Sequence, residues 1–237
     1  MNGTVAAITT RALLGRRRFA VLLPLPLLLV GLAALAHSLE PNPVDWGEPI
    51  VVGLGFGVVL PLIALVIGTG VLGSEIDDGT IIHILATPLR RRDIVLTKLA
   101  VAVGITTVTN GAAMFLTGVI IESARFGLGL AVACAAGSIA YSAVFVALSL
   151  LTRRPVLLGL LYVLIWEGVL GNLLSGSRLL SIQQYMVTIA ADTTASDLLN
   201  GRVSMPVAVV MSAVFLVGGT VLAVDRLRSF TLTGETT

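Results

Sequence analysis

The sequence predicts an all-α, polytopic membrane protein, and three observations support this class. Hydrophobic residues make up 56% of the 237 residues, and charged residues make up only 12%. Soluble domains carry about 25% charged residues, so this chain cannot cover the surface of a soluble globule. Six apolar segments are long enough to cross a bilayer, and strongly basic loops alternate with loops that contain few basic residues. A soluble enzyme, a disordered chain and a disulfide-rich secreted module are therefore excluded.

Six transmembrane helices are predicted from segment length. A spanning helix needs about 20 mostly apolar residues, because the hydrocarbon core is about 30 Å thick. The segments are Phe19–Ser38, Ile50–Gly73, Ile94–Ile121, Leu128–Thr152, Val156–Leu174 and Met205–Val224. Pro24 and Pro26 in the first span and Pro61 in the second are expected to kink their helices. No internal repeat or linker divides the chain, so residues 1–237 form one membrane domain.

The charges of the loops predict the orientation of the chain. The segment before the first span, the second and fourth loops and the C-terminal tail hold 12 of the 15 basic residues. The positive-inside rule therefore places both termini in the cytoplasm, as an even number of spans requires. Arg16–Arg18 and the apolar stretch after them also resemble a cleavable signal peptide. Because signal cores are only about 7–15 residues long, we favour an uncleaved first span.

Two further features of the N-terminal half are open to two interpretations each. Residues 1–18 have apolar positions at helical spacing followed by arginines, which predicts a cytoplasmic interfacial helix. That helix either anchors the topology or also contacts a partner. Gly53 and Gly57 would share one face of a helix. They indicate either a close helix contact or the ordinary use of glycine in membrane helices.

Residues 75–93, between the second and third spans, predict a short amphipathic helix at the cytoplasmic surface. Its apolar face consists of Ile81, Ile84 and Leu85, and acidic residues precede it. Pro88 disfavours helix at the residue before it, and Asp93 is expected to cap the helix of the third span. Exposed aliphatic side chains cost free energy in water, so lipid, this chain or a partner must cover them. A plain interfacial helix is the alternative to partner binding.

Glu167 is the only acidic residue inside a predicted span. A charge at such a depth costs about 2.5–3.5 kcal/mol or more unless it is paired or hydrated. Glu167 therefore either belongs to the substrate path or an outer gate, or anchors the helix to the outer loop, and its neighbour Trp166 favours the anchor. In the outer loop, residues 172–204, the apolar stretch Leu179–Ala191 is too short to cross the bilayer. A re-entrant or interfacial helix is expected there.

The reactive residues of the chain do not form a catalytic or metal-binding pattern. The single cysteine, Cys134, lies in an apolar run and is interpreted as a core residue. His37 and His83 are far apart and offer no ligand spacing. The single lysine, Lys98, is not part of the Gly-Lys-Ser/Thr sequence that a Walker-type phosphate loop requires. If the protein uses ATP, another chain must bind it.

Two stretches of the sequence resemble a known family. The first consists of Glu75, Gly79-Thr80-Ile81, Leu85-Ala86-Thr87-Pro88-Leu89-Arg90-Arg91 and Ile94-Val95-Leu96-Thr97-Lys98. The second consists of Leu164-Ile165-Trp166-Glu167-Gly168 and Leu179-Leu180-Ser181-Ile182-Gln183-Gln184-Tyr185. The first resembles the signature loop of the ABC type-2 permeases, and the second resembles their Trp-Glu pair and the outer segment that follows it. Six spans and cytoplasmic termini also match this family.

The resemblance implies roles for particular residues. The amphipathic helix would be a coupling helix that docks into a separate ATP-binding cassette ATPase subunit. The residues implied in this contact are Glu75, Asp78, Gly79, Thr80, Ile81, Ile84, Leu85, Pro88, Arg90 and Arg91. Trp166, Glu167 and Tyr185 would form an outer gate or packing cluster, close to short outer helices between spans five and six. This chain would bind no cofactor and no metal, and the partner would carry ATP and Mg.

The resulting functional hypothesis is the permease subunit of an ATP-driven exporter in a prokaryotic plasma membrane. The expected partners are the ATPase subunit, a second identical or different permease subunit and membrane lipid, without nucleic acid. Aromatic residues make up only 5% of the chain, which favours a small amphiphile, drug or lipid as substrate over a polymer. A non-transporting subunit that acts on a partner protein stays open. A secondary transporter is disfavoured because there is no repeat, and an intramembrane enzyme because Glu167 has no histidine nearby.

Overall fold

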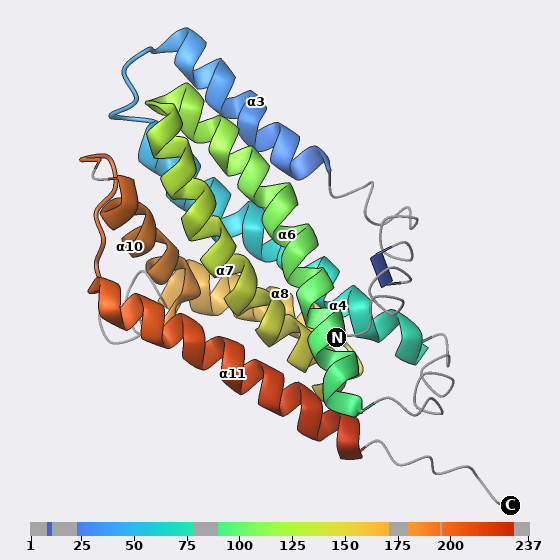
Figure 1. Cartoon of the computed structure of the whole chain (residues 1–237). Coiled ribbons are helices and arrows are strands. Elements are labelled where there is room, and N and C mark those ends of the chain that lie inside the picture. Colours follow the sequence, from blue (N-terminus) through green and yellow to red (C-terminus); the bar gives the residue numbers. More distant parts are fainter. Residues whose placement is uncertain (1–8, 11–22, 78–89, 171–179, 195, 230–237) are drawn as a thin grey trace, which may run out of the picture.

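The structure is a bundle of long helices, obtained as a computed structural model (Figure 1). It describes residues 9–10, 23–77, 90–170, 180–194 and 196–229, without the side chains of residues 74–77, 170, 228 and 229. Within these residues every regular element is a helix. The predicted all-α class is confirmed for this part of the chain.

The helices follow one another along the chain with short connections. In order they are α3 (Pro24–Leu39), η1 (Pro49–Val59), α4 (Leu60–Asp77), α6 (Arg91–Ile121), α7 (Ala124–Leu151), α8 (Pro155–Leu161), η2 (Tyr162–Leu170), α10 (Ile182–Thr194) and α11 (Met205–Ser229). The elements η1 and η2 are π-helices, and each is continuous with the α-helix next to it.

Four of the described helices are long and apolar enough to cross a membrane. They are Pro49–Gly73, Arg91–Ile121, Ala124–Leu151 and Met205–Leu227. They correspond to the second, third, fourth and sixth predicted spans. At the positions of the first and fifth spans the structure describes shorter apolar helices, Pro24–Leu39 and Pro155–Val169, which border residues outside the description. Four spans are thus supported by length and composition, and the count of six remains a prediction.

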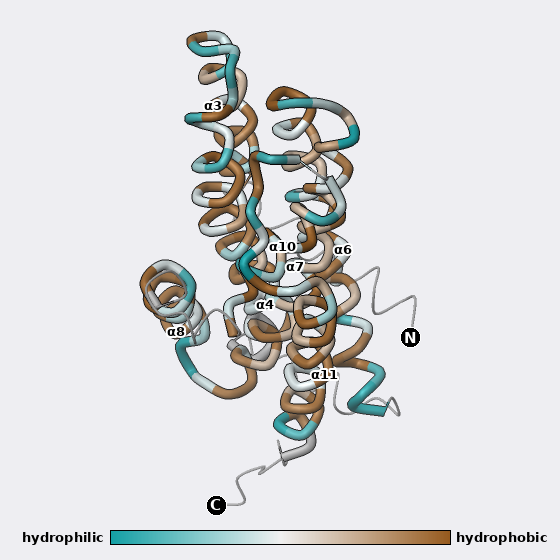
Figure 2. The backbone as a smooth tube through the Cα atoms, turned by 90° about the vertical axis from the view of Figure 1, so that its left-hand side faces the viewer, coloured by the Kyte–Doolittle hydropathy of each residue, from teal (hydrophilic) through white to brown (hydrophobic). Residues whose placement is uncertain are grey.

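The two ends of the bundle differ in charge. Figure 1 shows the end of α4, the start of α6 and the end of α11 at one end, and the α6–α7 turn and the α3–η1 connection at the other. The first end carries Arg90–Arg92 and Arg226 together with Asp93 and Asp225. The connections at the second carry Glu40, Asp45, Glu48 and Glu122, with Arg125 at the start of α7. In Figure 2 the hydrophobic colour follows the helices, and hydrophilic colour gathers in the connecting turns. Among the residues described at these two ends, arginines are therefore more numerous at the first.

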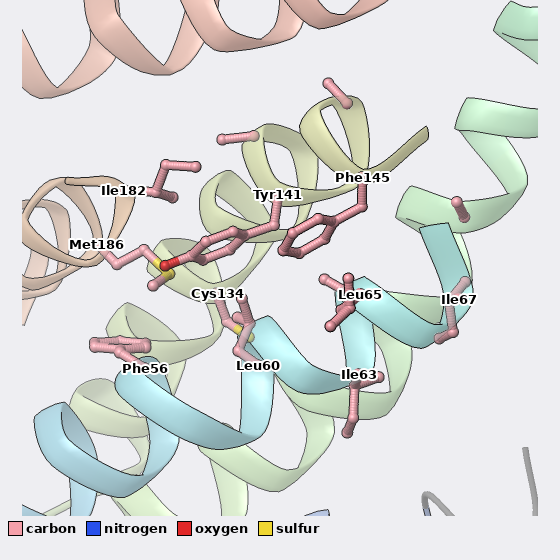
Figure 3. Close-up of a cluster of buried hydrophobic side chains, with 14 of the residues drawn as sticks. Phe56, Leu60, Ile63, Leu65, Ile67, Cys134, Tyr141, Phe145, Ile182 and Met186 are labelled. Atoms are coloured by element: carbon pink, nitrogen blue, oxygen red, sulfur yellow. The ribbon is translucent and has the colours of Figure 1, made fainter. Parts of the chain in front are cut away.

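Helix α7 lies at the centre of the bundle. It packs against α4, α6, α8, α10 and α11. Figure 3 shows part of the core that results, where Phe56, Leu60 and Leu65 face Cys134, Tyr141 and Phe145 of α7 and Ile182 and Met186 of α10. The rings of Tyr141 and Phe145 are stacked with their centroids 5.8 Å apart. Cys134 is a fully buried free thiol, which confirms its interpretation as a core residue.

The three prolines predicted inside spans lie near the starts of α3 and α4. Pro24 is the first residue of α3, and Pro26 lies in its first turn. Pro61 is the second residue of α4, directly after the change from π- to α-helix at Leu60. Pro61 thus lies inside the continuous helix Pro49–Gly73, and the expected proline kinks stay a prediction. In α3 the missing N–H of Pro24 costs no bond within the helix, because it is at the first position.

The start of the third span differs from the expectation by three residues. The helix α6 begins at Arg91 after an N-cap at Arg90 that offers no side-chain bond. Asp93 was expected to be the cap but lies in the first turn, where its N–H already bonds to the Arg90 carbonyl oxygen at 2.8 Å. A carboxylate there still complements the positive end of the helix dipole.

Candidate functional site

The carboxylate of Glu167 is the best-connected buried polar group described here. Glu167 lies in η2 and is 1% exposed. Its oxygens accept hydrogen bonds from Ser181 Oγ at 2.5 Å and Tyr162 Oη at 3.2 Å. They also accept from the backbone N–H groups of Ile182 at 2.9 Å and Gln183 at 3.4 Å. Four donors therefore converge on one carboxylate, which offsets the cost of burying it.

Two of these donors show what the carboxylate does for the fold. Ile182 and Gln183 are the first residues of α10, and N–H groups in the first turn of a helix have no partner within that helix. Glu167 supplies that partner from a different element and places a negative charge at the positive end of the helix dipole. Ser181 Oγ completes the cap by accepting from the N–H of Gln184 at 3.3 Å. The buried charge thus fixes where α10 starts.

Trp166 and Tyr185, which the sequence analysis grouped with Glu167 as an outer gate or packing cluster, also contact the elements around α10. Trp166 Nε1 donates to the carbonyl oxygen of Leu180 at 3.2 Å, next to the Glu167 contacts. Tyr185 is 1% exposed, and its ring lies 6.2 Å from the ring of Phe215 on α11. The structure therefore brings Trp166 and Glu167 together at the start of α10. It places Tyr185 one turn further along, between α10 and α11.

Helix α10 packs closely against α7. A Cβ atom on Gly137 would overlap Met186 Sδ, and one on Gly129 would overlap the Thr194 side chain. These two glycines are two turns apart on α7, and their partners lie two turns apart on α10 in the opposite direction. Small residues at this spacing let two helices approach closely. The re-entrant or interfacial helix expected within Leu179–Ala191 is observed as α10, three residues further along the chain, and it packs into the bundle.

Gln183 joins α10 to η1 and was not identified from the sequence. Its Nε2 donates to the carbonyl oxygen of Val52 at 2.8 Å. A Cβ on Gly57 would lie 3.0 Å from that nitrogen and 3.2 Å from the Val52 oxygen, whereas a Cβ on Gly53 would meet nothing within 4 Å. The two glycines, expected to share a helix face, thus have different surroundings. The sequence feature that could have indicated this contact is the pair Gln183-Gln184 in an otherwise apolar stretch.

Other buried polar groups on α6, α7 and α10 were also missed. Those without a hydrogen-bond partner among the described residues are Thr106 Oγ1, Asn110 Oδ1, Thr117 Oγ1, Ser138 Oγ, Tyr141 Oη, Ser142 Oγ and Gln184 Oε1. Thr106 and Asn110, and likewise Ser138 and Ser142, are four residues apart and so lie on one helix face. The interior around α7 is therefore more polar than the hydropathy of its helices predicts.

Lys98 links two helices at the opposite end of the bundle. Its side chain is fully buried, and Nζ donates to the carbonyl oxygen of Val71 on α4 at 2.8 Å. Arg91, one of the predicted contact residues, donates through Nη1 to the carbonyl oxygen of Leu227 near the end of α11 at 2.5 Å. Arg90 is exposed at the N-cap of α6. The start of α6 is therefore bonded to both α4 and α11.

Most of the predicted contact residues cannot be compared with the structure. Those outside the described residues are Asp78, Gly79, Thr80, Ile81, Ile84, Leu85 and Pro88. Glu75 lies in the last turn of α4, and its side chain is also outside the description. Of the predicted N-terminal interfacial helix, residues 1–18, only Thr9 and Thr10 are described, both helical. The coupling-helix expectation therefore stays a prediction.

The buried charged groups described above bond to the backbone of neighbouring helices. In the part of the chain that the structure describes, no group of three or more His, Cys, Asp or Glu side chains could hold a metal ion. His37 packs edge-on against Trp46, with ring centroids 6.4 Å apart. The two buried charged side chains described above, Glu167 and Lys98, each bond to the backbone of a neighbouring element. Both side chains therefore hold neighbouring elements in position.

One of two comparisons with known proteins identifies a family for this chain. A search of curated proteins found no match. A family model described as ABC-2 family transporter protein matches residues 16–166, which is more than half of the chain. The match includes α3, η1, α4, α6, α7, α8 and the start of η2, up to Trp166. The chain therefore belongs to the ABC-2 family and is a membrane permease component of an ABC transporter.

Proposed function

We propose that the chain is the permease subunit of an ATP-driven exporter, forms the substrate path as a dimer and is driven by separate ATPase subunits. Phe19–Ser38 and Val156–Leu174 would complete six spans, with α3 and the pair α8–η2 as their described parts. The basic end of the bundle would face the cytoplasm of a prokaryote, in accordance with the positive-inside rule. The substrate would be a small amphiphile, a drug or a lipid, since the chain is 56% hydrophobic and only 5% aromatic.

The burial of Lys98 is the observation that carries this proposal. A Walker-type loop needs an accessible lysine that reaches the nucleotide phosphates. Lys98 is the only lysine of the chain, it is 0% exposed, and its Nζ is bonded to the Val71 oxygen. This burial supports the assignment of ATP and Mg to a partner chain, with transport and not hydrolysis as the role of this subunit.

The same bond supports a route for coupling. Helices α4 and α6 lie on either side of residues 78–89 in the sequence, and Lys98 holds them together at that end. A force on the intervening segment would therefore move both helices as one unit. We assign the ATPase contact to Glu75, Asp78, Gly79, Thr80, Ile81, Ile84, Leu85, Pro88, Arg90 and Arg91, with the aliphatic residues filling the groove of the partner.

At the outer end we propose that Trp166, Glu167 and Tyr185 hold α10 as a closing helix. The helix has 13 residues, too few to cross the bilayer, and nearly all of its side chains are buried. The capping contacts of Glu167 favour the packing role over a direct role in the substrate path. In this proposal Glu167 contributes to export by keeping α10 in place.

The test is a pull-down with a candidate ATP-binding cassette subunit from the same genome, co-expressed with the tagged permease. Leu85→Asp should abolish ATPase association without removing the permease from the membrane, because a carboxylate cannot be buried in an apolar groove. Val44→Asp adds the same charge at a residue that is 64% exposed in the connection before η1, and should retain the ATPase. Full retention of the partner by Leu85→Asp would refute the docking role.

A further inference from the structure

A groove runs between the start of α6 and the end of α11, at the basic end of the bundle. Its volume is about 370 Å³, within the range of small-ligand sites. Its lining residues are Arg92, Leu96, Thr220, Val221, Val224 and Asp225. None of these residues has a role in the function proposed above.

The walls of the groove are apolar and face outward. Leu96 is 41% exposed and Val221 is 52% exposed. The span that contains α11 has a mean hydropathy of 2.5, yet only 17% of it is buried. Figure 2 shows the same helix as hydrophobic along most of its length. Exposed side chains on so apolar a spanning helix belong in hydrocarbon, so the groove opens toward lipid chains.

The lining of the groove includes a charge of each sign. Arg92 is exposed, and its side chain makes no hydrogen bond or ion pair with any residue of the described ranges. Asp225 lies on the α11 side of the same groove, and its carboxylate can accept from the lipid in addition to the interaction that it makes within the protein. The bond from the neighbouring Arg91 to the Leu227 carbonyl oxygen holds the two helix ends beside each other. Arg92 and Asp225 therefore line the same groove, between two helix ends that a hydrogen bond connects.

We propose that this groove binds one phosphatidylethanolamine molecule from the adjacent leaflet. The guanidinium group of Arg92 would bind the lipid phosphate, a pairing that guanidinium geometry favours. The carboxylate of Asp225 would accept from the lipid ammonium group, and an acyl chain would lie along Leu96, Val221 and Val224. A phosphatidylglycerol headgroup has no cation for Asp225, and a choline headgroup has no N–H to donate. This proposal depends on the membrane location that the family shows. It does not depend on the direction of transport.

The test measures lipid affinity on the purified, detergent-solubilised chain by native mass spectrometry. Phosphatidylethanolamine, phosphatidylcholine and phosphatidylglycerol with identical acyl chains are titrated separately. We expect phosphatidylethanolamine to bind most tightly. Arg92→Gln and Asp225→Asn should each weaken its binding about five-fold, as for one lost ion pair at a partly exposed site. Arg153→Gln removes an exposed cation in the α7–α8 connection and should leave the affinity unchanged.

A third variant tests the apolar wall of the groove while Arg92 and Asp225 stay unchanged. Val221→Trp fills the apolar wall at an exposed position, so it should reduce binding of phosphatidylethanolamine while the elution volume and helicity stay those of the unmodified protein. Equal affinity for the three lipids, a preference for phosphatidylglycerol, or an Arg92→Gln variant that binds like Arg153→Gln would each overturn the proposal. None of these outcomes depends on ATPase association, so a failure here is distinguishable from a failure of the exporter assignment.

Discussion

Two buried charges, at opposite ends of the bundle, satisfy backbone groups in opposite ways. Glu167 in η2 accepts from N–H groups at the start of α10, whereas Lys98 in α6 donates to a carbonyl oxygen of α4. Glu167 bonds to residues 14–16 positions later, across the segment that leads into α10. Lys98 bonds to a residue 27 positions earlier, across the predicted coupling segment.

The difference indicates what each charge controls. The carboxylate of Glu167 provides the acceptor for a helix start, so its loss should affect the stability and position of α10. The ammonium group of Lys98 connects two long helices that each have many other contacts, so its loss should affect how they move together. Replacing the Lys98 ammonium group by an apolar group of similar length removes the cost of burying the charge together with its bond, so the two effects on stability offset each other. The comparison therefore separates a stability effect from a coupling effect.

The largest expected effect is that of Glu167→Ala. Removing the carboxylate leaves Ser181 Oγ, Tyr162 Oη and two N–H groups without their acceptor in a buried site. We expect the free energy of unfolding to fall by about 3 kcal/mol. Glu167→Gln keeps one acceptor oxygen and should lose about half as much. Denaturation in detergent measures both values.

The matched control is Glu48→Ala, which removes an exposed carboxylate at the N-cap of η1 and should leave the unfolding free energy nearly unchanged. If Glu167→Ala is as stable as this control, the capping role is wrong. Export by both Glu167 variants at the normal rate, with normal folding, would remove this residue from the mechanism.

The next effect is that of Lys98→Met, which keeps the length of the side chain and removes its donor. We expect the unfolding free energy to change by less than about 1 kcal/mol. Nucleotide-driven transport in proteoliposomes should fall about ten-fold, a typical size for the coupling between two sites. The control Arg125→Met removes an exposed cation in the first turn of α7 and should transport normally. If Lys98→Met loses stability but keeps normal transport per ATP hydrolysed, Lys98 has a stability role and the proposed coupling role is wrong.

The smallest expected effect is the difference in stability between alanine substitutions at Gly57 and Gly53, which both lie in η1. Gly57→Ala places a Cβ 3.0 Å from Gln183 Nε2, so the bond to Val52 must lengthen or break. We expect a loss of about 1 kcal/mol in unfolding free energy. Gly53→Ala, where the added Cβ meets nothing within 4 Å, is the control and should cost nothing. Equal values for the two variants would show that the Gln183 contact does not stabilise the fold.

Long apolar segments made most of the described fold predictable from the sequence. The helices α6, α7 and α11 start and end within a few residues of the predicted spans, because a run of about 20 apolar residues has few other stable structures in a membrane. The sequence also indicated Glu167, since a carboxylate inside an apolar segment must find partners. The π-helical form of η1 was not predicted, because it depends on packing and leaves the hydropathy pattern unchanged.

The partners of the polar groups could not be predicted. Glu167 binds backbone N–H groups and Lys98 binds a carbonyl oxygen, and every residue other than proline supplies both kinds of group. The bond from Gln183 to Val52 depends on the packing of α10 beside η1, which hydropathy does not reveal. A single sequence thus identifies which side chains need partners, and the tertiary packing decides which atoms supply them.

The burial of Cys134 has a practical consequence for spectroscopy. It is the only thiol of the chain and is fully enclosed in the core, where maleimide reagents cannot reach it. A cysteine introduced at an exposed position, such as Val44 or Leu157, would then be the sole labelling site. Spin labels or fluorophores could be attached there without first removing a native residue. With cysteines at both Val44 and Leu157, the distance between the two labels could be followed through the transport cycle.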